Sequence, residues 1–347
     1  MTHARFKQEL QRFFNSFKII ILCLILVALV IVAVVGLQVH TIHFPEFLGN
    51  RYENIDHVKT VTDPNEFTFV VVGDVKCGTA TFEAMLDIIQ EDKPAFAVIV
   101  GDFVDHPELI SHKLFALEMT EHARNFPIFL VTGNHDIDPN GSFGLADFQK
   151  TYGASQFYFN LGKNLFVFLN NIPPYNQTGQ YLEFLEHALL NQTEKIEKIF
   201  VFMHIPPSGI NSSLMCRDLL GSEKLLEIVK NHHIEYVFSG DHHGYVKTEK
   251  DGTAFVVTGG GGDRLRGKYG KFHHLVRMSV KDGMVTETVV VAKKQLETAE
   301  LIERNIVVYI WPLIARNCLS AAVTIAIFGI AVWMLIYSLR ERKRLLK

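Results

Sequence analysis

The chain has 347 residues, enough for one or two domains with a sizeable buried core. Its net charge of −3 at pH 7 argues against a nucleic-acid-binding module, because such modules are normally basic. Hydrophobic residues make up 48% of the chain, and two apolar stretches, one at each end, account for much of this excess.

The first apolar stretch, 19–39, carries no charged residue and is long enough to cross a membrane as a helix. It lacks the short apolar core and A-x-A-like exit of a cleavable signal peptide, so we interpret it as an uncleaved anchor. The stretch 318–339 predicts a second spanning helix. Residues 306–315 are also apolar, but Pro312 and Arg316 separate them from that span, and we expect them to lie on the membrane surface.

Basic residues flank both predicted spans on the side of the chain termini, and the positive-inside rule therefore places both termini in the cytoplasm. The part between the spans is predicted to lie outside the cytoplasm, in a periplasm or at the cell exterior. The predicted organisation is a cytoplasmic N-terminus and transmembrane helix at 1–40, a linker at 41–65, a folded domain at 66–292, a linker and interfacial segment at 293–317, and a transmembrane helix with a basic tail at 318–347.

The predicted domain opens with an apolar, β-branched run at 67–73, which is typical of a buried strand. Helical spacing at 79–90 and 107–124 alternates with apolar strands at 95–100 and 127–131, and this alternation indicates parallel strands covered by helices. We expect two sheets packed face to face with helices outside. The later predicted strands are 157–159, 165–169, 199–203, 236–238, 245–247, 254–258, 275–280 and 285–291, and the later helices are 180–190 and 222–230.

Polar clusters follow five of the predicted strands. Because ligands bind beyond the carboxyl ends of strands in open α/β sheets, we expect these side chains to gather in one place. Carboxylates, amide oxygens and imidazoles together suit hard or borderline divalent metal ions. One Gly-Asp pair would be ordinary turn chemistry, but five clusters in order are not. They are Asp74-Val-Lys76, Gly101-Asp102 with Asp105, Gly133-Asn134-His135-Asp136, His204, and Gly240-Asp241-His242-His243.

In this order the clusters resemble the motifs of calcineurin-like metallophosphoesterases, which are D-x-H, GDxxD, GNH[DE], a lone His and GHxH. The resemblance covers roughly residues 66–292, and three motifs match without change. It implies an α/β fold, a four-layer α/β/β/α sandwich, to which this chain adds one transmembrane helix at each end. It also implies metal-dependent hydrolysis of a phosphate mono- or diester.

The resemblance implies roles for the matching residues. The cofactor would be one or two divalent ions of Mn, Fe or Zn. His135 would stabilise a phosphoryl oxygen or protonate the leaving oxygen, and Asp136 would orient the His135 ring. The implied metal ligands are Asp74 and His243 for a first ion, Asn134 and His204 for a second, and Asp102 as the bridge between them.

Two positions depart from the family pattern: Lys76 replaces the His of D-x-H, and Asp241 replaces the first His of GHxH. Asp241 can still bind a metal ion, whereas the ammonium of Lys76 cannot. Asp105 could supply the missing ligand, the ammonium could replace the first ion, or the thiolate of Cys77 could ligate. We expect Asp105 to do so in a two-ion site, because a second ion balances the crowded carboxylates better than an ammonium does.

In that case Lys76 would point outward and hold the substrate phosphate. His242 is a further candidate near the second ion. Arg264 and Arg266, in a basic loop after the Gly run at 259–262, are also candidates for phosphate binding, although a solvated loop explains them equally well. Cys77 and Cys216 are expected outside the cytoplasm, where a disulfide is chemically allowed, and the sequence does not decide whether they pair.

Attachment to the lipid bilayer at both ends makes a phospholipid or lipid-linked phosphate a candidate substrate. The alternative function is that of a catalytically impaired protein that binds a phosphorylated ligand. The departures at Lys76 and Asp241 favour that alternative, whereas the intact His135 and Asp136 favour an enzyme.

Overall fold

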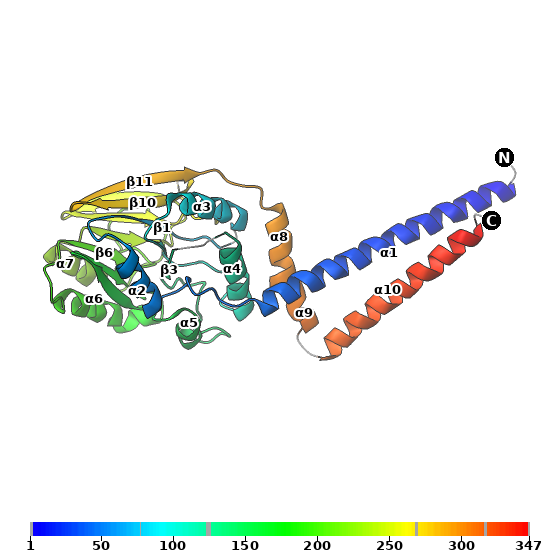
Figure 1. Cartoon of the computed structure of the whole chain (residues 1–347), viewed down its shortest axis with the longest axis horizontal. Helices are drawn as coiled ribbons and strands as arrows, with labels where there is room; N and C mark the ends of the chain where they lie inside the picture. The colour runs from blue at the N-terminus through cyan, green and yellow to red at the C-terminus, as the bar shows by residue number, and fades with distance from the viewer. Residues whose placement is uncertain (1–2, 77, 123–125, 268–269, 316–317, 346–347) are drawn as a thin grey trace. The chain divides into compact units, whose positions relative to one another are not determined.

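The computed structural model describes residues 3–76, 78–122, 126–267, 270–315 and 318–345. The chain forms two compact units. The first combines residues 1–41 with 302–347, and the second is the domain at 42–301 (Figure 1).

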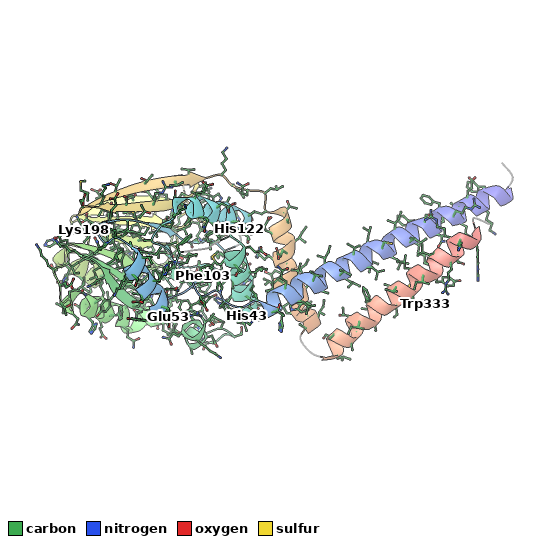
Figure 2. The ribbon with its side chains drawn as sticks, in the orientation of Figure 1. His43, Glu53, Phe103, His122, Lys198 and Trp333 are labelled. Carbon is green, nitrogen blue, oxygen red and sulfur yellow. The ribbon has the colours of Figure 1, made fainter. Side chains whose placement is uncertain are left out.

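The first unit is a pair of long helices, α1 (His3–Thr41) and α10 (Cys318–Leu345). They lie side by side, and the side-chain amide of Asn15 on α1 donates a hydrogen bond of 3.0 Å to the Ser338 carbonyl on α10. Most of their apolar side chains are exposed, as Trp333 shows in Figure 2. Glu9–Thr41 and Leu319–Arg344 are, by length and composition, apolar enough to cross a membrane, as the sequence predicted.

The segment between the domain and α10 is helical. The ring of Trp311 packs so closely on α1 that a Cβ added at Gly36 would lie 2.0 Å from it. Val307 is fully buried. These contacts show an apolar segment packed on protein, while its location at a membrane surface stays a prediction, and Arg316 lies outside the described residues. The elements are α8 (Thr298–Asn305), the π-helical turn η2 (Ile306–Ile310) and α9 (Trp311–Ala315).

The domain contains two sheets, of five and six strands. In the first, β1, β2 and β3 are parallel and β10 runs antiparallel to β1. In the order of the sheet, its strands are β11 (Met284–Ala292), β10 (His273–Lys281), β1 (Glu66–Val72), β2 (Phe96–Ile99) and β3 (Ile128–Leu130).

The second sheet has parallel pairing from β5 to β9, with an antiparallel strand at each edge. In the order of the sheet, its strands are β4 (Phe157–Leu161), β5 (Asn164–Phe168), β6 (Lys198–Phe202), β7 (Tyr236–Ser239), β9 (Thr253–Thr258) and β8 (Tyr245–Lys250). Every predicted strand is therefore present.

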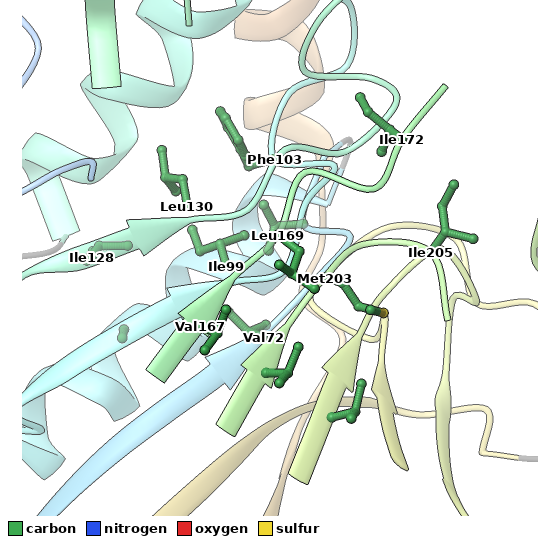
Figure 3. Close-up of a cluster of buried hydrophobic side chains, with 14 of the residues drawn as sticks. Val72, Ile99, Phe103, Ile128, Leu130, Val167, Leu169, Ile172, Met203 and Ile205 are labelled. Atoms are coloured by element: carbon green, nitrogen blue, oxygen red, sulfur yellow. The ribbon is translucent and has the colours of Figure 1, made fainter. Parts of the chain in front are cut away.

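Both faces of the central strands are buried, which explains their continuous apolar sequences. Along β1, Phe67, Phe69 and Val71 belong to a phenylalanine-rich cluster between the sheets, where the rings of Phe69 and Phe166 lie 5.5 Å apart. The alternate residues belong to a second cluster on the helix-covered faces. Figure 3 shows part of this second cluster, with Val72 on β1 and Val167 on β5.

Helices cover the outer face of each sheet, so the predicted two-sheet α/β architecture is confirmed (Figure 1). Met85 and Ile89 of α3 and Met119 of α4 share the outer cluster with Val72, and Leu185 of α6 shares it with Val167. The covering helices are α3 (Thr79–Asp92), α4 (Leu109–His122), α6 (Gln180–Leu190) and α7 (Ser222–Asn231).

Among the described elements between α1 and α8, three were not predicted from the sequence: α2 (Tyr52–Val61), α5 (Leu145–Tyr152) and the short η1 (Tyr175–Thr178). The first lies in the segment predicted as a linker. Just before it, the Gly49 amide donates to the Ile128 carbonyl at 2.9 Å, and the Asn50 side chain donates to the Leu130 carbonyl at 2.7 Å. These bonds extend the edge of β3, so residues 42–65 are part of the folded domain.

Candidate metal centre

Three aspartates stand just beyond the carboxyl ends of β1, β2 and β7. Asp74, Asp102 and Asp241 all adopt left-handed backbone conformations, with φ of 54°, 54° and 59°, which non-glycine residues rarely adopt. Such strained residues often mark functional sites. The loop after β3 approaches so closely that a Cβ added at Gly133 would lie 2.4 Å from Oδ1 of Asp102. Only glycine allows this approach.

Asp74, Asp102 and His243 form one candidate ligand group, with ligand atoms all within 4.8 Å of one another. The Nδ1 of His243 lies 3.0 Å from the Arg264 carbonyl and must donate to it, so the Nε2 lone pair faces Oδ1 of Asp74 at 3.4 Å. That Oδ1 atom is buried and accepts no hydrogen bond from the described residues. Burial raises the pKa of Asp74 well above its usual range, so an ionised Asp74 requires a nearby cation.

His204 forms the centre of a second group. Its Nδ1 donates to the Val100 carbonyl at 2.8 Å, which leaves Nε2 facing Oδ1 of Asn134 at 3.3 Å and Oδ1 of Asp102 at 3.4 Å. Oδ1 of Asp241 lies 3.9 Å away. Burial lowers the pKa of His204, but the surrounding carboxylates outweigh burial and raise it. The site therefore stabilises positive charge at Nε2, and the donor set fits a divalent ion.

Lys76 lies inside this centre. Its side chain is 5% exposed, and its ammonium lies 2.7 Å from Oδ2 of Asp102 and 3.8 Å from Oδ2 of Asp263. Burial lowers the pKa of Lys76, but Asp102 outweighs this and raises it, so the amine stays protonated. The prediction that Lys76 points outward is wrong, because the nearby carboxylates hold the ammonium inside.

Asp241 is held by a second cation, Arg217, which was not predicted from the sequence. Both the guanidinium and the backbone amide of Arg217 donate to the Asp241 carboxylate, the amide at 2.6 Å. Two residues earlier, the Met215 amide donates to Nδ1 of His242 at 3.0 Å. The loop between β6 and α7 is therefore fixed to the motif that follows β7.

His135 presents its ring to the centre, with Nε2 at 4.0 Å from Oδ2 of Asp102. The other ring nitrogen donates to the Asp105 carbonyl at 2.8 Å, so this carbonyl holds the ring. Asp136, which we expected to orient the ring, instead accepts hydrogen bonds from four backbone amides. These belong to Asp102, Phe103, Val104 and Gly133.

Asp136 is therefore a structural clamp between the loops that follow β2 and β3. Burial raises its pKa to about 7 and Asp102 adds to the effect, while the amide of Gly133 acts in the opposite direction. Phe103, whose amide is one of the four donors, lies inside the domain (Figure 2).

The remaining candidates lie at the edge of the centre. The Arg266 amide donates to the His243 carbonyl at 2.7 Å. The Arg264 and Arg266 side chains are exposed. Asp105 contributes its carbonyl to His135, and the role of its carboxylate as a metal ligand stays a prediction. Cys77 lies outside the described residues, so both its pairing with Cys216 and its role as a ligand also stay untested.

Among the described residues, Arg217 and Asp263 also pair with charged groups of the centre, and neither was predicted from the sequence. Arg217 lies 24 residues before its partner Asp241, and Asp263 lies far along the chain from Lys76. Neither belongs to a motif with recognisable spacing. Asp263 directly follows the Gly run at 259–262, and an acidic residue at that place was the local feature by which the sequence could have indicated it as a site residue.

The family model described as calcineurin-like phosphoesterase matches residues 67–245, which is more than half of the chain. The chain belongs to the calcineurin-like phosphoesterase family. All five of its strand-end motifs fall within the matched segment, including the two variant positions of this phosphoesterase, Lys76 and Asp241.

One solved structure supports the same fold. A dimetal phosphatase from Danio rerio is 12% identical, with a TM-score of 0.51 and coverage of 67% of this chain and all of that one. GAP50, the anchor in the inner membrane complex of Plasmodium, is 15% identical, with a TM-score of 0.48 and coverage of 70% and 95%. At 12% identity, the likeness to the Danio rerio phosphatase shows the fold alone. No curated protein is similar enough in sequence to count as a match.

Proposed function

We propose that this phosphoesterase hydrolyses a phosphate mono- or diester outside the cytoplasm, with a divalent metal ion held at His204. The arrangement around His204 supports this most directly. Its Nε2 faces three oxygen atoms, those of Asp102, Asn134 and Asp241, and carboxylate and amide oxygens can all act as metal ligands. A divalent ion there supplies Lewis-acid activation of the phosphoryl group.

His135 is placed to manage the proton of the leaving oxygen. Its Nδ1 proton is committed to the Asp105 carbonyl, and its ring is 35% exposed, so Nε2 can reach a bound ester. A protonated Nε2 would donate to the leaving oxygen and would be stabilised by Asp102 at 4.0 Å. Asp136 would act through the backbone of both loops, as a positioning residue.

Arg266 is the stronger of the two arginine candidates for binding the phosphate. Burial lowers the pKa of His242, and the charge of Arg266 lowers it further, which indicates that the guanidinium lies near this end of the centre. Arginine binds phosphate through paired hydrogen bonds. We include Arg264 in the same loop as a weaker candidate, because its side chain is exposed and its contact with His243 is made by its backbone carbonyl.

The membrane attachment supports the proposed location and substrate. Two apolar helices with basic outer flanks would tether the domain outside the cytoplasm, and a tethered site would favour a phospholipid or a lipid-linked phosphate.

The alternative is a phosphoesterase fold that binds a phosphorylated ligand without cleaving it. The ion pairs of Lys76 with Asp102 and of Arg217 with Asp241 favour it, because each occupies a carboxylate that a fully active centre would use for metal.

One experiment separates the two functions. Full-length protein in detergent is assayed with bis-p-nitrophenyl phosphate and p-nitrophenyl phosphate in the presence of Mn²⁺ or Zn²⁺. We expect hydrolysis that Asp102→Asn abolishes, that His135→Ala reduces roughly 10²–10⁴-fold, and that exposed Asp56→Asn leaves unchanged. Equal rates for wild type and Asp102→Asn, with vanadate or phosphate still bound, would support the non-hydrolytic function instead.

A further inference from the structure

We infer that this centre holds one divalent ion, bound at His204, and that the ammonium of Lys76 permanently takes the place of the family's other ion. The inference rests on the proposed metal centre. It concerns the number and position of the ions, which can be measured separately from hydrolysis.

The two oxygens of Asp102 face different cations. Oδ2 lies 2.7 Å from the Lys76 ammonium. Oδ1 lies 3.4 Å from Nε2 of His204 and also accepts the amide of His135 at 3.0 Å. The residue expected to bridge two ions therefore bridges an ammonium and the His204 group.

The position of the Lys76 ammonium is fixed by its surroundings. The Lys76 side chain is 5% exposed, its backbone amide donates to the Asp102 carbonyl at 3.2 Å, and Asp263 supplies a second carboxylate at 3.8 Å. Asp263 is itself held in place, because its amide donates to the Asp74 carbonyl at 3.1 Å. A metal ion binding to Asp74, Asp102 and His243 would meet this buried like charge, and a protonated amine offers it no lone pair.

Charge balance agrees with a single ion. Besides Asp136, whose carboxylate is held by four backbone amides, four buried carboxylates surround the centre, and two basic side chains pair with members of this group of four. With the carboxylates ionised, two negative charges remain, which one divalent ion neutralises. A second ion would instead leave a positive excess. The carboxylates are Asp74, Asp102, Asp241 and Asp263, and the cations are Lys76 and Arg217.

The His204 group is the better place for that ion. Its Nε2 faces oxygen atoms, and its imidazole is oriented by the Val100 carbonyl so that a lone pair points toward them. Nitrogen and oxygen donors together suit a borderline ion such as Mn²⁺, Fe²⁺ or Zn²⁺. At Asp74 and His243, by contrast, the Lys76 ammonium already lies against their shared partner Asp102, 2.7 Å from its Oδ2.

The test measures metal content. Purified full-length protein is loaded with Mn²⁺, dialysed and analysed by elemental mass spectrometry, with circular dichroism to confirm folding. We expect about one ion per chain in wild type and about two in Lys76→His, which restores a ligand at that position. Lys163→His, at an exposed lysine, should match wild type. His204→Ala should lose the ion, whereas Asp74→Asn should keep it.

Electron paramagnetic resonance of the Mn²⁺-loaded wild type gives an answer that needs no variant to fold. An isolated Mn²⁺ gives a six-line spectrum, and two ions sharing a carboxylate give a coupled one. About two ions in wild type, or a coupled spectrum, would overturn the inference while leaving the proposed metal centre intact. Loss of the single ion in Asp74→Asn but not in His204→Ala would overturn the inference and also the placement of the ion at His204. No bound ion in wild type would reject both.

Discussion

The backbone amide of Asp102 donates a hydrogen bond of 2.9 Å to the carboxylate of Asp136. The bond joins the loop after β2 to the loop after β3, and the amides of Phe103, Val104 and Gly133 converge on the same carboxylate. The Asp102 side chain is thereby directed toward Lys76 and His204. The observed bonds of the Asp136 carboxylate go to backbone amides and not to these two side chains.

Replacing Asp136 with Asn should destabilise the domain by roughly 2–5 kcal/mol, because two of the four buried amides would lose their acceptor. Chemical denaturation of full-length protein measures the change. Asp147→Asn is the matched control, since this exposed side chain accepts a single bond, from Gly144. If Asp136→Asn lowers the free energy of unfolding no more than Asp147→Asn does, the four amides do not depend on the Asp136 carboxylate.

Glu297→Ala should loosen the start of α3. The Glu297 carboxylate accepts bonds from the Ala80 amide at 3.0 Å and from the amide and hydroxyl of Thr81 at 3.1 and 2.7 Å. These are the free amides of a helix N-terminus, and losing such a cap costs about 1 kcal/mol. Hydrogen exchange at Ala80 and Thr81 should accelerate roughly fivefold for each kcal/mol lost. Exposed Glu227→Ala serves as the control and should leave both amides unchanged.

Stability should fall as the pH drops from about 6.5 toward 3, partly because of two buried histidines. Burial lowers the pKa of His112 to about 3 and that of His274 to about 4. An unfolded histidine takes up a proton near pH 6.5, whereas these folded ones do not until lower pH, so acid favours the unfolded chain. The free energy of unfolding falls by about 1.4 kcal/mol per pH unit for each of the two histidines. The fall stops once the pH is below the pKa of that histidine in the folded protein.

His112→Gln should lower the stability at neutral pH, since His112 bonds to Tyr152 and to the Asp136 carbonyl, but it should also flatten the slope between pH 6.5 and 4.5. Exposed His187→Gln should leave the slope unchanged. If stability falls with pH at the same slope in wild type and in His112→Gln, the low pKa of His112 does not contribute to acid unfolding.

Cysteine labelling of intact cells checks the predicted topology. In a background with all four native cysteines replaced by serine, a membrane-impermeant maleimide should label Glu194→Cys, in an exposed loop of the domain, without permeabilisation. Lys343→Cys, at the basic end of α10, should be labelled only after the membrane is opened. Labelling of Lys343→Cys in intact cells, or protection of Glu194→Cys, would reject the two-span orientation.

The sequence by itself determined the two-sheet architecture and the convergence of the ligand candidates. Apolar strands buried on both faces have a strong local signature, and parallel strands place their carboxyl ends at one edge. The order of the motifs alone was therefore enough to place Asp74, Asp102, Asn134, His204 and His243 together. Helix α2 was missed because its fixation depends on distant residues: Val58 is buried in the phenylalanine-rich cluster, and the chain just before the helix bonds to the edge of β3.

Only the tertiary structure decided where the charges of the centre go. The chain after Asp74 allows Lys76 to point either way, and its direction is set by Asp102 and Asp263, which are distant in sequence. Likewise, Arg217 neutralises Asp241 across a loop with no motif. Ion pairs depend on distances through space and on burial, and neither quantity is encoded in the spacing of residues along the chain.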